Sequence, residues 1–341
     1  MAGETPAFWW RSDAGWPARC LFPAAALYGA VSRWRMDRGA RVETGLPVIC
    51  VGNFTVGGGG KTPTCLALAK AALAQGLRPG FVSRGHGGAT RSAVLVDPEH
   101  HHAGLVGDEP MLLAHQAPTA VAVNRGEAAA LLRAEGVDFI IMDDGFQSAR
   151  LAVDFALLVV DAGRGIGNGR VLPAGPLRAP LIDQVRHADA LLVVGKGAAG
   201  DEAIRRTARG GKPVFEAHLQ AREPERLHGV PLFAFAGIAD PAKFYRTLAD
   251  LGLSVAGTRD FPDHHVFSGE EIAELKEAAA RGGARLVTTA KDAARLRASR
   301  LGAEFLENTE VLEVDLVFEP HDLGRRFVRE TLAAHRRRRS R

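Results

Sequence analysis

The chain has 341 residues, of which 46% are hydrophobic and 24% charged, and its formal net charge at pH 7 is +4. These proportions are those of a globular protein and exclude a disordered chain, and the length exceeds that of a usual single domain, so we expect two domains with a sizeable core. We expect no membrane-spanning helix, since no run approaches about 18 apolar residues. Three scattered cysteines, Cys20, Cys50 and Cys65, favour a reducing compartment such as the cytoplasm, without disulfides.

The first 38 residues form a segment rich in tryptophan and arginine. All four tryptophans of the chain fall in it, and Leu27, Tyr28, Val31 and Trp34 recur at helical spacing among arginines. This combination predicts an amphipathic helix that lies in a membrane interface. Packing of the same apolar stripe against the protein is the alternative. A cleaved signal peptide is disfavoured, because the nucleotide loop that follows requires cytosolic ATP.

A buried strand, a glycine-rich turn and a helix are predicted within residues 46–74. The glycines let backbone N–H groups surround phosphate oxygens, the lysine after them adds positive charge, and the next hydroxyl can bind a magnesium ion. The strict GxxxxGK[ST] pattern fails at its first glycine, and a flexible turn with a solvated lysine is the alternative, but the order of strand, loop and helix favours a nucleotide site. The predicted ATP-binding residues are Thr55, Gly57, Gly58, Gly59, Gly60, Lys61 and Thr62.

Charged residues end several of the next predicted elements. Arg84 follows the strand at 78–83 and Arg125 follows the strand at 121–124, so each is a candidate anion contact, or simply caps its loop. Asp108 and Glu109 precede a short apolar helical stretch, where acids can abstract a proton, bind a metal, or only stabilise a helix N-terminus. These three signals are weak individually.

The apolar strand at 139–142 runs directly into Asp143 and Asp144. An acid at the end of a strand downstream of a phosphate loop is the arrangement that holds magnesium in nucleotide-binding proteins, whereas solvated turn acids are the alternative. Further strands at 155–160 and 190–194 flank a long proline- and glycine-rich loop at 168–178, which is expected to be functional or to border a domain. The alternation of strands and helices predicts an α/β fold with a mainly parallel sheet and helices on both faces.

A second, smaller α/β domain is predicted from about residue 221. Its polar loop contains His264 and His265, a weak zinc signal and a better candidate for an acid–base group. Six of the last seven residues are arginine or histidine, and we expect a disordered tail that is either solvated or in contact with anionic lipid or nucleic acid. The predicted division of the chain is an interfacial segment at 1–38, a nucleotide-binding domain at 39–220, the smaller domain at 221–330 and the basic tail at 331–341.

The motifs, in chain order, are GNFTVGGGGKTP, FVSRGHGG, GDEP, DDGFQ, NGRVLPAGPLR, FPDHH and TTAKD. Together they resemble the tetraacyldisaccharide 4'-kinase family, also called the lipid A 4'-kinases, over nearly the whole chain to about residue 330. Thr55 belongs to this family's variant of the phosphate loop. Gly59 departs from it, because the family commonly has threonine there, which removes a local hydroxyl contact.

The resemblance implies transfer of the γ-phosphate of ATP to the 4'-hydroxyl of a tetraacylated glucosamine disaccharide 1-phosphate. It also implies Mg²⁺ as cofactor and a peripheral location on the cytoplasmic face of the bacterial inner membrane. The expected partners are this lipid substrate and the membrane surface, which the N-terminal aromatic and basic helix would contact; no nucleic acid is expected. An alcohol nucleophile requires a base, a transferring phosphoryl group requires positive charge and a metal, and a lipid substrate requires an interfacial anchor.

The resemblance also implies roles for individual residues. Asp108 would be the base and pair with a histidine of the second domain, for which His264 is favoured over His265. Thr62 and Asp143, with Asp144 or Glu109, would hold magnesium. The candidates for the 1-phosphate or sugar of the substrate are Arg84, Arg125 and Arg178, because the planar fork of arginine suits phosphate.

Two other functions stay open on the sequence alone. One is a P-loop NTPase that drives assembly or metal delivery, and the other is a nonenzymatic, membrane-bound nucleotide sensor. The sensor is disfavoured, because mere binding would require neither a base nor metal ligands.

Overall fold

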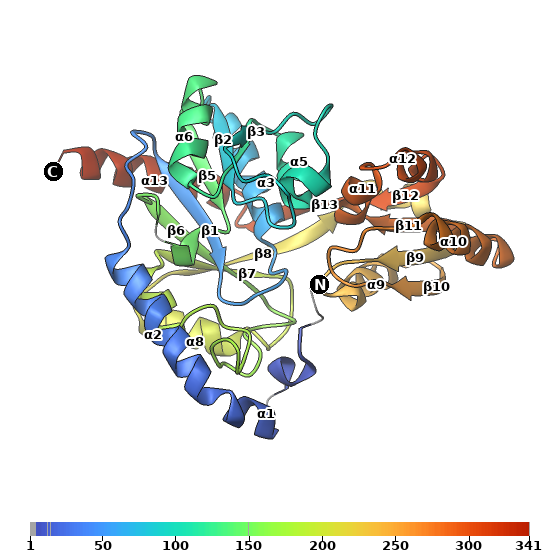
Figure 1. Cartoon of the computed structure of the whole chain (residues 1–341), viewed down its shortest axis with the longest axis horizontal. Coiled ribbons are helices and arrows are strands. Elements are labelled where there is room, and N and C mark those ends of the chain that lie inside the picture. The colour runs from blue at the N-terminus through green and yellow to red at the C-terminus, as the bar shows by residue number, and fades with distance from the viewer. Residues whose placement is uncertain (1–4, 12, 14, 149, 341) are drawn as a thin grey trace.

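The computed structural model describes residues 5–340 except 12, 14 and 149. They form two α/β units, a larger one around a nine-stranded sheet and a smaller one around a four-stranded sheet (Figure 1). Residues 1–4 of the predicted interfacial segment and Arg341 of the predicted tail lie outside the described residues. The α/β class and the second, smaller sheet predicted from the sequence are confirmed.

The larger sheet has the strand order β13-β8-β7-β6-β1-β5-β2-β4-β3. Its pairs are parallel except β8 with β13 and β3 with β4, as a chain that alternates strands with helices requires. The central strand β1 therefore leads into the glycine-rich loop between the ends of β5 and β6. The strands are β1 Val48–Asn53, β2 Pro79–Ser83, β3 Val94–Leu95, β4 Thr119–Val121, β5 Phe139–Asp143, β6 Phe155–Asp161, β7 Ala190–Val194, β8 Val214–Ala221 and β13 Val314–Glu319.

Helices cover both faces of this sheet, as predicted. Successive side chains of a strand point to opposite faces, and along β1 Val48 and Cys50 belong to one core cluster while Ile49 and Val51 belong to the other. The first cluster includes residues of α2 (Phe22–Arg38), α6 (Arg125–Ala134), α7 (Leu181–His187) and α8 (Asp201–Arg209). The second includes residues of α3 (Lys61–Leu73), α5 (Asp108–Ala114) and α13 (Leu323–Arg339).

The smaller sheet is entirely parallel, in the order β10-β9-β11-β12. Its two core clusters are centred on aromatic and aliphatic side chains such as Phe235, Phe305 and Leu248. The elements are β9 Leu232–Ala236, α9 Pro241–Asp250, β10 Val255–Asp260, α10 Gly269–Arg281, β11 Arg285–Thr289, α11 Ala290–Leu296, α12 Arg300–Leu306 and β12 Thr309–Leu312. Short elements elsewhere are η1 Ala7–Trp10, α1 Gly15–Cys20, α4 Ala103–Val106, η2 Phe146–Ser148 and η3 Pro224–Leu227.

After the smaller sheet the chain returns to the larger unit. β13 pairs antiparallel with β8, and α13 packs against α3. A boundary at residue 330 would assign β13 and the first turns of α13 to the smaller unit, although both complete the larger one. We therefore propose that the smaller unit comprises residues 222–313.

The basic C-terminus continues α13 instead of forming a disordered tail. The helix runs to Arg339, and the side chains of His335 and Arg338 each come within 3.3 Å of the Asp154 carboxylate. Phe327 and Val328, about two to three turns earlier, are fully buried in the core. The prediction of disorder was wrong, because an apolar stripe and a buried acid hold this helix to the body.

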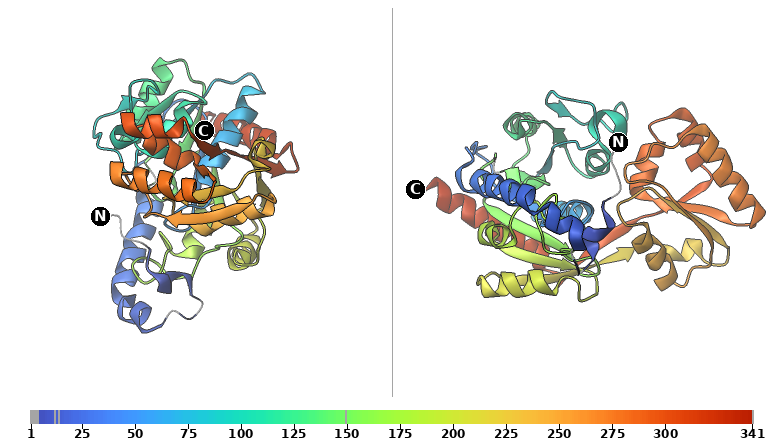
Figure 2. Two further views of the ribbon diagram at one scale, coloured as in Figure 1. Left: turned by 90° about the vertical axis from the view of Figure 1, so that its right-hand side faces the viewer. Right: turned by 60° about the horizontal axis from the view of Figure 1, so that its bottom comes forward.

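The N-terminal helix α2 lies along the outside of the larger unit (Figure 2). Its small side chains face the protein, and Ala25 and Gly29 are buried. Met36 near the end of the helix is also buried, but the other large apolar side chains face outward, with Leu27 70% and Trp34 61% exposed. Packing of this apolar stripe in the core, the alternative considered for the sequence, is therefore wrong. None of the helices described is long and apolar enough to cross a bilayer.

Candidate active site

The glycine-rich loop forms a cradle at the carboxyl end of β1. Gly57 (φ +94°) and Gly60 (φ +87°) adopt the left-handed backbone region that favours glycine. A Cβ atom at Gly58 would meet no heavy atom of the described chain within 4 Å, so the loop leaves space above it. Asn53 holds the start of the loop in place, since its Nδ2 donates to the Gly57 carbonyl at 3.1 Å. Open backbone amides at the start of a helix fit the phosphates of a nucleotide.

Lys61, the first residue of α3, lies beside Asp144 at the end of β5. Its Nζ is 3.8 Å from Asp144 Oδ1. Arg178 Nη1 donates to both Asp144 oxygens, at 2.7 and 2.9 Å, and its Nε donates to the Thr55 carbonyl. Burial alone would raise the pKa of Asp144, but the charges of Lys61 and Arg178 hold it below its usual value. Asp144 therefore orders the loop through Arg178, although the sequence assigned Asp144 to metal and Arg178 to substrate.

Asp143, the last residue of β5, has a different environment. It is buried, and the structure described here has no basic group within 4 Å of its carboxylate. The Cys65 Sγ is 3.8 Å from its Oδ1. Burial raises the pKa of Asp143 to about 6, despite the opposing charge of Lys61. A buried carboxylate without a cation gains most from a divalent metal, so the magnesium role predicted for Asp143 fits this geometry.

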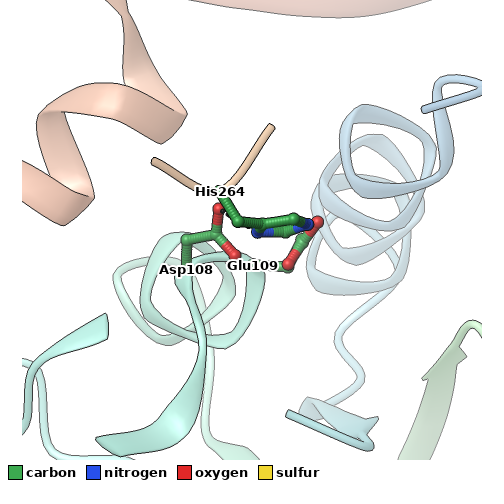
Figure 3. A group of neighbouring side chains, drawn as sticks. All are labelled: Asp108, Glu109 and His264. Atoms are coloured by element: carbon green, nitrogen blue, oxygen red, sulfur yellow. Dashed lines mark ion pairs between the residues drawn. The ribbon is translucent and has the colours of Figure 1, made fainter. Parts of the chain in front are cut away.

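Asp108 and Glu109 begin α5, and His264 approaches them from the loop after β10 (Figure 3). The Nδ1 atom of His264 is 3.2 Å from Asp108 Oδ2. Hydrogen bonding to Asp108 raises the pKa of His264. Ligand atoms of Asp108, Glu109 and His264 lie within 4.8 Å of one another, close enough to share a metal ion. The pairing of Asp108 with a histidine of the second unit was predicted, and His264 is the partner.

Two basic side chains of α11 complete this contact between the units. Arg295 Nε donates to Asp108 Oδ2 at 2.9 Å, and Lys291 Nζ donates to Glu109 Oε1 at 2.6 Å. Burial would raise the pKa of Asp108, but the hydrogen bond from His264 and the charge of Arg295 lower it. Asp108 Oδ1 is buried and accepts no hydrogen bond from the residues described. Side chains of the smaller unit therefore hold Oδ2, while Oδ1 is free to accept a hydrogen bond from another group.

The sequence reasoning gave Lys291 and Arg295 no role. A signal was present, because residues four apart lie on the same face of a helix and two cations in that spacing suit a pair of acids. The partners are 182 and 187 residues away, so only the fold could identify them.

The other predicted residues lie in varied surroundings. Arg84 is exposed after β2. Arg125 is buried and donates to the Asp144 carbonyl and to Ser148, so it supports the loop after β5 from inside. His265 pairs with Glu271, away from Asp108. Among the three predicted substrate arginines, only Arg84 is thus open to solvent and without an ion pair to a described acid.

Comparisons with known proteins agree with this geometry. The family model described as "Tetraacyldisaccharide-1-P 4'-kinase" matches residues 17–332. A tetraacyldisaccharide 4'-kinase of Sinorhizobium fredii is 53% identical over 100% of this chain and 99% of its own length. One of Agrobacterium fabrum is 53% identical over 94% of this chain and 92% of its own length.

A solved structure has the same fold. It is the crystal structure of LpxK from Aquifex aeolicus in complex with ATP, which is 25% identical and covers 92% of this chain and 99% of that chain with a TM-score of 0.71. The family match and the two relatives extend over nearly all of the sequence, including the glycine loop, the acids at the ends of the strands and His264. The chain therefore belongs to the tetraacyldisaccharide 4'-kinase family.

Proposed function

We propose that this protein transfers the γ-phosphate of ATP to the 4'-hydroxyl of a tetraacylated glucosamine disaccharide 1-phosphate, a step of lipid A biosynthesis. The observation that carries the proposal is the free Oδ1 of Asp108, a carboxylate oriented by His264 and Arg295 on a helix that packs against α3 of the phosphate loop. Such a base can accept the proton of an alcohol nucleophile, and membership of the tetraacyldisaccharide 4'-kinase family makes the disaccharide hydroxyl that nucleophile. Transfer of labelled phosphate to the lipid acceptor tests it.

Asp108 accepts the hydroxyl proton in this mechanism. Its pKa is held below the usual value, so the carboxylate is deprotonated and ready when the acceptor arrives. His264 and Arg295 both contact Oδ2, which leaves Oδ1 for the sugar hydroxyl. His264 thereby orients the base, in the way that a second group orients the base in other acid–base pairs.

The glycine loop and Lys61 bind the donor. The amides of residues 57–60 surround the β- and γ-phosphates, and Lys61 adds charge where it develops during transfer. Thr62 and Asp143, with Glu109 as a third group, would hold Mg²⁺, which when bound neutralises charge on the phosphates. Asp144 stays with Arg178 and Lys61. Arg84 remains the best placed of the three predicted arginines for an anionic group of the substrate, because it is exposed.

Asp143→Asn should raise the Mg²⁺ concentration needed for half-maximal activity about tenfold or more, because it removes a charged ligand from the site. ATP binding measured in EDTA should change little. Asp189→Asn is the control, since it removes a carboxyl just before β7 that accepts the backbone N–H of Ala156. Equal Mg²⁺ requirements for wild type and Asp143→Asn would remove Asp143 from the metal site.

We propose that the outward face of α2 enters the cytoplasmic surface of the inner membrane and brings the enzyme to its lipid substrate. This face carries Leu27, Tyr28, Val31 and Trp34, with the exposed arginines Arg35 and Arg38 beside them. Apolar and aromatic side chains flanked by arginine suit the boundary between acyl chains and anionic headgroups. The opposite face is held to the protein, for example through the ion pair of Arg33 with Asp183 at 2.7 Å.

Replacing Leu27, Val31 and Trp34 together by serine should weaken binding to anionic phospholipid vesicles at least about tenfold, because each buried apolar side chain contributes about 1.5 kcal/mol or more. Activity on detergent-dispersed substrate should be retained. The control replaces Leu73 and Leu301, which are 46% and 45% exposed on other helices. If vesicle flotation finds undiminished binding of the triple variant, α2 is not the anchor.

A further inference from the structure

Arg164, in the loop after β6, lies beside the glycine loop on the side opposite Asp144. β6 and β5 flank β1 in the sheet, so the loops that follow them border the glycine loop from two sides. Lys61 and its partner Asp144 occupy the β5 side. A recess lined by Gly58, Gly59 and Arg164 marks the β6 side.

One N–H group of this arginine is aimed at the glycine loop and lacks a partner. The Nη1 atom of Arg164 is buried and makes no hydrogen bond with any residue described. A Cβ atom at Gly57 would lie 3.5 Å from that same Nη1. The Gly57 carbonyl accepts a hydrogen bond from the Asn53 side chain and makes none with this Nη1. A buried charged donor costs free energy unless it is satisfied, so an acceptor absent from the polypeptide is expected at this place.

The side chain is held in position by an aromatic ring. The Arg164 guanidinium lies over the Trp10 ring, with its Cζ 3.9 Å from the ring centroid. Trp10 belongs to η1 and donates through its indole N–H to Thr5. Stacking fixes the plane of a guanidinium while its N–H groups stay free to bind an anion. Asp161 accepts the backbone N–H of Arg164 and pairs with Lys243 of the smaller unit. The charges of Asp240, Asp161 and Asp263 act on the guanidinium, but none of the described acids lies within 4 Å of it.

We propose that Arg164 binds the transferring γ-phosphoryl group of ATP and stabilises its charge during transfer, as an arginine supplied within the same chain. Phosphate oxygens in such a loop lie within hydrogen-bond distance of the loop amides, and Arg164 Nη1 borders the loop at Gly57. Lys61 and Arg164 then contact the phosphates from the β5 and β6 sides. Arginines that act in this way contribute about 10³- to 10⁵-fold to the rate in other phosphoryl-transfer enzymes.

The inference rests on the proposed kinase reaction, and its test separates the two. Purified wild type, Arg164→Ala and the control Arg170→Ala, another half-buried arginine of the same loop, are assayed with γ-labelled ATP, Mg²⁺ and the acylated disaccharide 1-phosphate in detergent. If wild type forms no labelled lipid, the kinase proposal fails. If it does, we expect kcat to fall at least about 100-fold in Arg164→Ala and less than threefold in Arg170→Ala.

Three further measurements exclude a merely structural role. ADP, which lacks the γ-phosphate, should bind wild type and Arg164→Ala equally well. Added guanidinium ion should restore part of kcat in Arg164→Ala but not in Lys61→Ala. Trp10→Leu should lower kcat about tenfold, and Trp10→Phe, which keeps a stacking ring, should recover most of it. A kcat of Arg164→Ala within threefold of wild type, or equal losses of ADP affinity and of kcat, would overturn the inference.

Discussion

Asp108→Asn should lower kcat about a thousandfold and leave ATP affinity nearly unchanged. Asparagine keeps the size of the side chain but cannot accept the proton of the attacking hydroxyl, and positioned general bases contribute about 10²- to 10⁴-fold. Because Asp108 is the buried partner of Arg295, the substitution will also destabilise the contact between the units. Single-turnover transfer and ATP titration, together with a melting curve, separate loss of chemistry from loss of fold.

His264→Gln tests the same assignment without removing the partner of Arg295. We expect kcat to fall about a hundredfold, since Asp108 keeps its charge but loses one of the two groups that orient Oδ2. The loop offers a matched control in a second histidine–acid pair, His265 with Glu271 at 2.9 Å. His265→Gln should keep at least a third of the wild-type rate. Near-wild-type transfer by both Asp108→Asn and His264→Gln would remove this pair from the mechanism.

Lys61→Ala should lower kcat/KM about 10²- to 10³-fold. Lys61 begins the helix after the glycine loop and is the nearest lysine to the cradle, and removing one preorganised charge contact to a developing anion typically costs about 10²- to 10³-fold. The fold should survive, because Arg178 Nη1 still donates to both oxygens of Asp144.

Lys70→Ala is the control for this prediction. Lys70 lies on the same helix but pairs with Asp315 at 2.6 Å, far from the loop. It should transfer phosphate at the wild-type rate, and Lys61→Arg should not restore activity because a planar guanidinium does not replace a compact ammonium group. Equal kcat/KM for Lys61→Ala and Lys70→Ala would exclude Lys61 from phosphate binding.

The local motifs were predictable because they depend on neighbouring residues. Continuous apolar runs ending in acids or glycines marked β1 and β5, and alternation of strands with helices indicated the parallel sheet. The apolar face of α2 could also be predicted, since the spacing of Leu27, Val31 and Trp34 places them on one side of a helix. Which side meets the protein depended on the small residues Ala25 and Gly29, whose burial no local pattern specifies.

The different surroundings of two adjacent acids could not be predicted from their neighbours in the sequence. Asp143 ends β5 and Asp144 follows it, and the sequence made both candidates for magnesium, Asp143 directly and Asp144 as an alternative to Glu109. Asp144, just after the strand, adopts a left-handed backbone conformation (φ +54°). Its carboxylate accepts a hydrogen bond from Arg178, which lies on a loop 34 residues later in the chain. Asp143 stays in the strand and is buried. Contacts at this separation are set by the packing of elements, which also explains why the partners of Arg295 and the position of Arg164 could not be predicted from the sequence.

The prediction of a disordered C-terminus was wrong for a different reason. A run of arginines predicts a solvated segment. The helix α13, however, combines that run with buried apolar residues at helical spacing, such as Leu323 and Phe327. The periodic stripe was the informative signal, and the charges obscured it. Asp154 adds a buried carboxylate against which the last turns pack.

One assay tests the central claim most directly. Purified protein is incubated with γ-labelled ATP, Mg²⁺ and the tetraacylated disaccharide 1-phosphate, and the extracted lipid is resolved and counted. The account predicts a labelled lipid bisphosphate that forms with wild type and is absent with Asp108→Asn. Release of labelled inorganic phosphate without labelled lipid would identify an NTPase, ATP binding with neither product would identify a sensor, and either result would contradict the account.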